Sequence, residues 1–217
     1  FYPRLQQYHR FLAGRLGSST TRSLRSNLLK TWDYFYNSGG WGDYPPQVEV
    51  HARGLEDRVA PVITSAHAIR TARMLSQMAS LLGRGDDIAE YRDDVDTLSR
   101  ALLNAAWDEN SGYMGYVVHG EDGLPQGILR HDSGANYNLG LDGLYGLVAG
   151  IGSEDQRARM LAHLRAPEEI MTPFGLSAVS QVAPYYRVDG YWNGTVWMAH
   201  QWFFWKALLD HGEDALA

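Results

Sequence analysis

Asp43 is the residue whose setting best suits acid–base chemistry. It lies in the run GGWGDYPPQ (39–47), where glycines permit unusual backbone angles and prolines exclude a helix interior. A carboxylate held between Trp41 and Tyr44 is expected to be partly desolvated, which raises its pKa toward the range that a general acid needs. Asp ahead of Pro is also common in turns. The local sequence therefore leaves two roles open, catalytic acid and turn residue.

A second candidate site is aromatic. The segment GYWNGTVW (190–197) stands just before a helix-periodic stretch. Tyr191, Trp192 and Trp197 offer faces on which a sugar ring could stack. Asn193 adds an amide, and Gly194 would let a ligand approach the backbone. Aromatic packing at the start of a helix is the alternative interpretation.

The remaining polar groups give weaker indications. The run RHDSGANYN (130–138) could line a polar pocket, although a solvated loop is the preferred interpretation. His51 and His67 flank the first long predicted helix, and a structural role is favoured for each. Metal-ligand spacings, a nucleotide-binding glycine loop after a strand and a serine nucleophile elbow are all missing from the sequence. We therefore expect no metal and no cofactor.

The composition excludes several classes of protein. A chain of 217 residues with 45% hydrophobic and 20% charged residues is ordinary for a globular domain. Its net charge of −6 argues against nucleic acid as a partner, and no apolar run approaches a membrane span. Zero Cys excludes disulfides but leaves the compartment open. Seven Trp and thirteen Tyr lean toward a carbohydrate partner, although core filling explains them about as well.

Helical periodicity predicts the elements that must position these residues. Apolar stripes predict helices over 64–82, 87–106, 141–149, 153–164 and 195–211, and also over 3–16 and 24–35. Gly83 is expected to end the first of these, and Ser153 with Gln156 reads as a capping box. A short link joins the first predicted helix to the second, and another joins the third to the fourth, which predicts two antiparallel hairpins.

Irregular segments separate the hairpins. Residues 37–61 and 172–194 are expected to be non-helical, and 112–119 to form a short strand paired with 128–131 around a turn at 121–125. Long loops in a compact domain are usually functional. Their recurrence before helices is expected if successive hairpins present loops to a common centre.

The two motifs, in this order and helical setting, resemble glycoside hydrolase family 63 and its mannosylglycerate hydrolase-like relatives. The resemblance is carried by the Gly/Asp-rich run before Pro45 and by a Tyr-Trp-x-Gly-x-x-Trp motif that Tyr191, Trp192, Gly194 and Trp197 match in full. Segments 81–83, 143–150 and 175–177 are similar too. The resemblance implies an all-α (α/α)6 toroid, with residues 1–217 forming a single catalytic domain or part of one.

The resemblance also implies an activity. It points to an inverting, exo-acting glycoside hydrolase that cleaves a small glycoside or an oligosaccharide end, without a cofactor and with Asp43 as general acid. The implied substrate-binding residues are Trp41, Tyr44, Gln47, Tyr191, Trp192, Asn193, Gly194 and Trp197. The family's general base is a Glu after the aromatic helix. We expect that base beyond Ala217, in a remainder of the enzyme that completes the toroid, or else among Glu49, Glu56 and Asp189.

Other functions stay open on the sequence alone. A trehalase-like hydrolase or a sugar epimerase could use the same scaffold, because fold does not determine function. A non-catalytic carbohydrate-binding or helical scaffold domain is the alternative from a different class. The chain starts at Phe1 without an initiator Met or a signal-peptide pattern, which is expected of an excised or processed segment.

Overall fold

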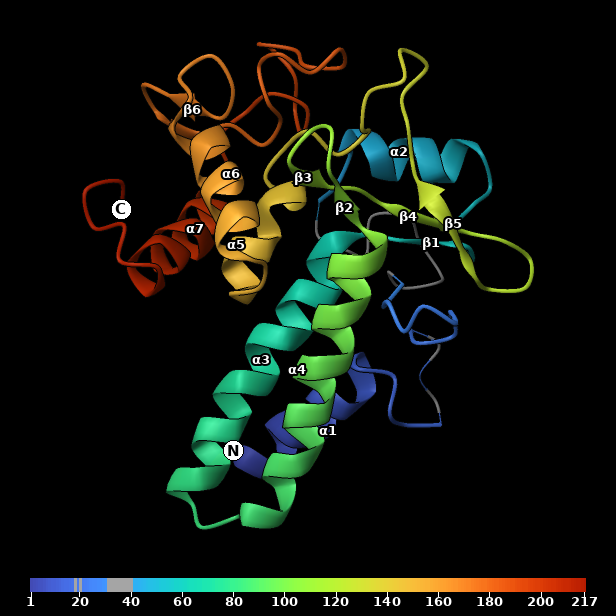
Figure 1. Ribbon diagram of the computed structural model, residues 1–217, viewed down its shortest axis with the longest axis vertical. Helices are drawn as coiled ribbons and strands as arrows, with labels where there is room; N and C mark the ends of the chain where they lie inside the picture. Colours follow the sequence, from blue (N-terminus) through green and yellow to red (C-terminus); the bar gives the residue numbers. More distant parts are fainter. Residues whose placement is uncertain (18, 20, 31–40) are drawn as a thin grey trace.

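A computed structural model describes residues 1–17, 19, 21–30 and 41–217, and helices dominate it (Figure 1). Its helices are α1 (Tyr2–Leu12), α2 (Pro45–Ala52), α3 (Val62–Leu81), α4 (Gly85–Ala105), α5 (Tyr145–Ala149), α6 (Glu154–Arg165) and α7 (Met198–Asp210), with a 3-10 turn η1 (Asp142–Leu144) before α5. Helices α5, α6 and α7 gather at one end of the long α3–α4 pair (Figure 1).

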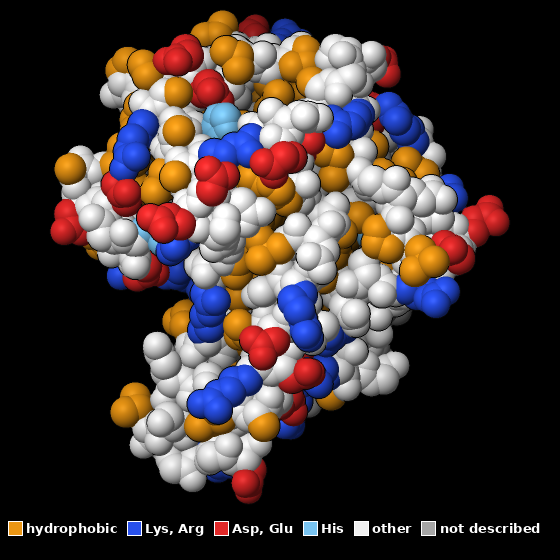
Figure 2. Space-filling model, viewed as in Figure 1, with side chains coloured by type: hydrophobic (Ala, Val, Ile, Leu, Met, Phe, Trp, Pro, Cys, Tyr) orange, Lys and Arg blue, Asp and Glu red, His pale blue; other side chains and the backbone are white. Residues whose placement is uncertain are grey.

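The long hairpin of α3 and α4 confirms the two helices expected over 64–82 and 87–106. Gly83 follows the C-terminus of α3 with φ +67°, a left-handed angle that suits glycine and reverses the chain. Asp86 and Asp87 occupy the first turn of α4, where the helix dipole favours negative charge. The two helices pack along their length and stand out from the rest of the molecule (Figure 2).

The second expected hairpin is formed by α5 and α6. Gly150 ends α5 with φ +68°. Ser153 and Gln156 form the expected capping box: the Gln156 N–H donates to Ser153 Oγ at 3.1 Å, and the Ser153 N–H donates to Gln156 Oε1 at 2.9 Å. Helix α7 begins at Met198, three residues later than expected, because residues before it are extended and pair with the chain at Ser177.

Two expectations about the N-terminal third are wrong. Residues 24–30 form turns instead of a helix, with Asn27 in a left-handed conformation at φ 68°, and residues 31–35 lie outside the described residues. The segment 37–61 was expected to be non-helical, yet α2 begins at Pro45. Proline is well suited to the first helical positions, because its missing N–H would have no intrahelical partner there. The prolines therefore start a helix where they were expected to exclude one.

Short strands lie between the hairpins. The expected strand pair is present as β4 (Val117–His119) against β5 (Pro125–Ile128), with Val117 opposite Ile128. β5 begins three residues before the expected position, and β1 (Val59–Ala60) joins β4 on its other side. The remaining strands are two-residue pairs: β2 (Trp107–Asp108) with β3 (Tyr113–Met114), and β6 (Met171–Thr172) with β7 (Gly175–Leu176). Strands this short carry no readable alternation in sequence.

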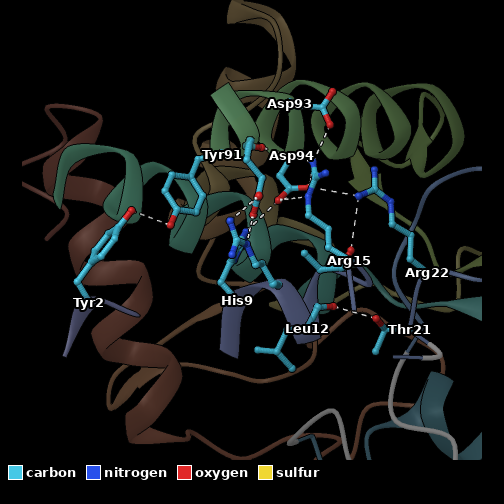
Figure 3. A network of polar contacts seen from close by, with 12 residues as sticks. Tyr2, His9, Leu12, Arg15, Thr21, Arg22, Tyr91, Asp93 and Asp94 are labelled. Atoms are coloured by element: carbon cyan, nitrogen blue, oxygen red, sulfur yellow. Dashed lines mark hydrogen bonds and ion pairs between the residues drawn. The ribbon is translucent and has the colours of Figure 1, made fainter. Parts of the chain in front are cut away.

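A buried ionic cluster fixes α1 to the α3–α4 hairpin (Figure 3). Asp94 of α4 is fully buried and contacts His9 Nε2 at 3.0 Å, Arg15 Nε at 2.9 Å and Arg22 Nη1 at 3.2 Å. Burial alone would raise the pKa of Asp94, but the hydrogen bonds from His9 and Arg15 outweigh it and lower that pKa. The N-terminal segment is thus held by one carboxylate and three basic side chains.

We expect Asp94→Asn to lower the free energy of unfolding by about 3 kcal/mol or more, since it leaves buried cations uncompensated. The matched control is Asp93→Asn. Asp93 is the neighbouring residue and also contacts Arg15, at 2.6 Å, but its side chain is 63% exposed. That change should cost less than about 1 kcal/mol. Urea denaturation followed by circular dichroism measures both, and equal effects would refute the role of Asp94.

Candidate active site

The ring of Trp41 is the meeting point of the two candidate motifs. It is fully buried, and the ring of His200 stacks on it with centroids 4.0 Å apart and an interplanar angle of 18°. Tyr44 and Trp192 pack around it at centroid distances of 4.6 and 5.4 Å. Tyr145 meets it edge-on at 6.1 Å. The structure thus brings together the Asp43 segment, the aromatic motif and helix α7.

The aromatic motif is itself a stacked unit. Trp192 and Trp197 lie parallel with centroids 4.1 Å apart, and Tyr191 meets Trp197 edge-on at 4.9 Å. The indole N–H of Trp197 donates to the Tyr191 carbonyl, which closes the loop in front of α7. Trp192 is only 8% exposed, whereas Tyr191 is 59% exposed. The outer rings, Tyr191 and in part Trp197, therefore form the accessible surface of this unit.

Gly42 allows the Asp43 segment and the aromatic motif to pack closely against each other. Its φ of +45° is left-handed, and a Cβ built on it would overlap the indole nitrogen of Trp192. Any side chain here would have to push Trp192 out of its stack with Trp197. The glycine before Asp43 is thus required by packing as well as by backbone conformation.

Asp43 itself is exposed, while the aromatic residues that flank it, Trp41 and Tyr44, are fully buried. The desolvation expected from Trp41 and Tyr44 is not seen, because both rings turn into the core. The Tyr44 hydroxyl donates to Asn138 Oδ1 at 2.8 Å. The Asp43 segment therefore has two buried anchors, one on each side of the exposed Asp43.

A buried polar network below Tyr44 was missed by the sequence reasoning. Fully buried Asp142 accepts hydrogen bonds from the Tyr116 hydroxyl at 3.1 Å and the Asn138 amide at 3.3 Å. It also accepts backbone N–H groups of Val62 and Ile63 at the start of α3. Burial raises the pKa of Asp142 to about 7, although these bonds oppose the rise. The signal in the sequence was one acidic residue inside the apolar stretch 139–149.

The polar run 130–138 divides between the two roles considered for it. Arg130, Asp132 and Ser133 are exposed, as expected of a solvated loop. Asn136 and Asn138 are buried, so the preferred interpretation is wrong for them. The Asn138 amide also donates to the Met114 carbonyl at 2.9 Å, which ties this run to β3.

Two histidines are built into the aromatic core. His200 Nδ1 lies 2.8 Å from the Tyr145 hydroxyl, and His67 packs edge-on against Tyr145 and Phe203. Burial lowers the pKa of both His67 and His200 to about 4; nearby Arg70 adds to the lowering at His67, and nearby His67 adds to it at His200. Both rings are therefore neutral near pH 7, and the structural role expected for His67 is consistent with this packing.

The other candidate residues lie in two layers. Gln47 is buried with Trp41, Tyr44 and Trp192, and the Asn193 amide donates to the Tyr185 carbonyl at 3.3 Å. Gly194 lies so close to the Arg187 carbonyl that a Cβ would overlap it. The buried layer supports the loops, and the accessible layer contains Asp43, Tyr191 and part of Trp197.

The three carboxylates considered for the general base all contact a basic side chain. Glu49 lies 2.5 Å from Arg53, Glu56 lies 2.6 Å from His51, and Asp189 lies 3.5 Å from Arg187. In the part of the chain that the structure describes, no cluster of His, Asp and Glu could hold a metal ion. Within the same residues, no helix is long and apolar enough to cross a bilayer.

The helical hairpins and the aromatic loops at the start of α7 place the chain among the (α/α)6-type glycosidases in fold. More particularly, residues 2–217 match the mannosylglycerate hydrolase MGH1-like glycoside hydrolase domain, and the chain belongs to that family. No curated protein sequence gives a significant match.

Solved structures show the same fold at low sequence identity. The glucose complex of family 63 mannosylglycerate hydrolase from Thermus thermophilus is 20% identical, with a TM-score of 0.59 over 80% of this chain and 38% of that chain. A sialidase is 15% identical, with a TM-score of 0.67 over 98% of this chain and 18% of its own. Neutral trehalase Nth1 from Saccharomyces cerevisiae is 14% identical, with a TM-score of 0.54 over 73% and 29%. The chain thus spans well under half the length of each.

We expect Gly42→Ala to destabilise the protein more than Gly54→Ala does. Gly54 is also left-handed, at φ +62°, but a Cβ there meets nothing within 4 Å. The control should therefore cost about 1 kcal/mol from backbone strain alone. Gly42→Ala adds the collision with Trp192, so its loss should be larger and its tryptophan fluorescence should shift to the red. Equal losses in chemical denaturation would show that the Gly42–Trp192 contact is unimportant.

The buried histidines predict a loss of stability in acid. Their folded pKa of about 4 lies below the ordinary value of 6.5, so the stability they confer is complete above pH 6.5 and is lost as pH falls toward 4. Asp142 contributes in the opposite sense, losing stability as pH rises from 3.8 through about 7. We expect His200→Gln to flatten the fall in unfolding free energy between pH 6.5 and 4.5. His131→Gln, in the loop bonded to Ser133, is the control and should keep the wild-type slope.

Proposed function

We propose that this chain forms part of an inverting, exo-acting glycoside hydrolase in which Asp43 is the proton donor. The observation that carries the proposal is the position of Asp43. Asp43 is exposed, and its segment is held by the packing of Trp41 against Trp192 and His200. This packing supports the proposal, because Asp43 and the accessible rings of Tyr191 and Trp197 belong to one packed unit, as a proton donor and a stacking surface for one substrate would have to.

The proposed chemistry uses two carboxyl groups. Asp43 protonates the leaving glycosidic oxygen while a second carboxylate activates water on the opposite face of the sugar, which inverts the anomeric configuration. In an inverting enzyme these groups stand about 6.5–9.5 Å apart, leaving room for the water. We place the base after the aromatic helix, in the remainder of the enzyme, with Glu49, Glu56 and Asp189 as the alternatives within this chain.

We propose that the accessible layer binds the sugar directly and that the buried layer supports it. Tyr191 and Trp197 would stack on the apolar face of a sugar ring, and Asn193 with Gly194 would supply polar contacts along the loop. Trp41, Tyr44, Gln47 and Trp192 would act by holding that layer in position. The indole N–H of Trp41 has no hydrogen-bond partner among the described residues, and its burial is in keeping with this supporting role.

The outer face of α7 supports the proposal that further helices of the same enzyme complete the toroid. Its exposed apolar side chains follow one another at intervals of four, three and four residues: Met198, Trp202, Trp205 and Leu209. That spacing forms one stripe on a helix whose opposite face already packs into the core. Contiguous exposed apolar surface is typical of a contact site.

The similar structures suggest which substrates to test first. One is described as a mannosylglycerate hydrolase and another as a trehalase. A panel of mannosylglycerate, trehalose and aryl glycosides, assayed with the intact enzyme, would define the sugar and the linkage. Following the anomer first released by nuclear magnetic resonance would test inversion directly.

We expect Asp43→Asn in the intact enzyme to lower kcat by about 10²–10⁴-fold with KM changed by only a few-fold, because Asn keeps the shape but cannot donate the proton. A nitrophenyl glycoside needs less protonation at its leaving oxygen, so it should recover much of the lost rate where cleavage limits turnover.

The control is Asp132→Asn, which removes an exposed carboxylate on a neighbouring loop. This variant should keep near-normal turnover. Normal turnover of Asp43→Asn on natural substrates would make Asp43 a turn residue, and Asp132 and Asp189 would be the next candidates for the acid.

A further inference from the structure

A cavity of about 480 Å³ lies between α3, α5, α6 and the end of α7. Its lining includes Arg70 and Arg73 from α3, Arg157 from α6, and Asp210 and His211 from the C-terminal end of α7. Trp41 and Trp192 pack near the opposite end of α7, roughly 20 Å away for a helix of thirteen residues. The surface of the molecule is indented where the α3–α4 hairpin leaves the other helices, and basic side chains lie beside the indentation (Figure 2).

Part of this positive charge has a structural task. Arg70 donates to the Val148 carbonyl at 2.9 Å, Arg73 donates to the carbonyls of Ala149 and Gly150, and His211 Nε2 lies 3.0 Å from the Leu147 carbonyl. These groups are the last carbonyls of α5, which lack partners inside the helix. Basic side chains at a helix C-terminus also complement its dipole.

The hydrogen bonds to the end of α5 do not neutralise the positive charge of the residues that line the cavity. Three arginines line the cavity, whereas Asp210 is the only acidic side chain that the described part of the chain adds to its lining, at 3.0 Å from Arg70. The helix end adds about half a negative charge. Among the described residues Arg73 has no carboxylate partner, and partial desolvation together with the nearby Arg70 lowers its pKa. The cavity therefore holds a net positive charge in a chain whose net charge is −6.

Arg157 is the arginine of the cavity that has no part in capping α5. It contacts no carbonyl of α5. Its Nε reaches the Ser153 carbonyl at 3.4 Å, a long contact on its own helix, and no carboxylate of the described residues pairs with it. It lines the same cavity as Arg70 and Arg73, and like charges that share a cavity repel unless an anion lies among them.

We propose that this cavity binds a small ligand through an oxyanion, a phosphate or a carboxylate group, held by Arg73 and Arg157. Guanidinium groups suit both ions, because their planar forks donate paired hydrogen bonds to two oxygens. Met74, Leu147 and Val148 line the same cavity and would contact the body of the ligand. The proposal concerns the far end of α7 and does not depend on the assignment of Asp43.

Inorganic phosphate and acetate serve as probes, titrated calorimetrically into the purified protein at pH 7.5 against chloride of equal ionic strength. We expect binding of one or both ions, and we expect Arg157→Gln to weaken it by about tenfold or more, the usual effect of losing a hydrogen bond to a charged group. Arg100→Gln, on the exposed face of α4, is the matched control and should bind like the wild type. Acetate binding would assign a carboxylate site, and phosphate binding alone a phosphate site.

The stability of each variant separates a binding role from a structural one. Arg157→Gln should keep the wild-type melting temperature in chloride and lose only the rise that the ion produces. Arg73→Gln should lose both, because it also removes a cap from α5. Responses no larger than those to chloride, or equal binding by Arg157→Gln and Arg100→Gln, would overturn the proposal.

Discussion

The burial of Trp41 is the interaction on which the candidate site depends. Its ring stacks on His200 of α7 and packs against Trp192 and Tyr145, so segments more than 150 residues apart in sequence share one core. A tryptophan buries on the order of 200 Å² of surface, which makes it a strong anchor for a loop with little regular structure. Gly42 and Asp43 follow directly, so their positions are set by an anchor that they do not themselves provide.

The second constraint is electrostatic. Asp142 is buried at the N-terminus of α3 and is surrounded by hydrogen-bond donors, an arrangement that offsets part of the cost of removing a carboxylate from water. Through Asn138 it is linked to the Tyr44 hydroxyl, on the other side of Asp43 from Trp41. One side of the Asp43 segment is thus fixed by aromatic packing and the other by directed hydrogen bonds, which resist displacement in different ways.

The sequence predicted the helices well where local signals agree. Gly83, the Ser153–Gln156 box and a long apolar period each act within one turn, and the structure confirms them. It failed at Pro45 and Pro46, where prolines that start a helix were expected to exclude one. It failed also at Asn138 and Asp142, which are buried because the hydroxyl groups of Tyr44 and Tyr116, from distant segments, donate hydrogen bonds to them. The convergence of Trp41 with Trp192 was predicted only because the family resemblance put both motifs in one site; their burial was not.

Helix α7 connects the candidate active site with the arginine cavity, since its start carries the aromatic loop and its end lines the cavity. A rigid helix between two sites does not by itself couple them. A ligand in the cavity would stabilise the folded chain through mass action, without altering the proton transfer that we propose for Asp43. Coupling would require two positions of α7 with different affinities at each end. The buried stack of His200 on Trp41 opposes such movement, because a shift of α7 would expose both rings.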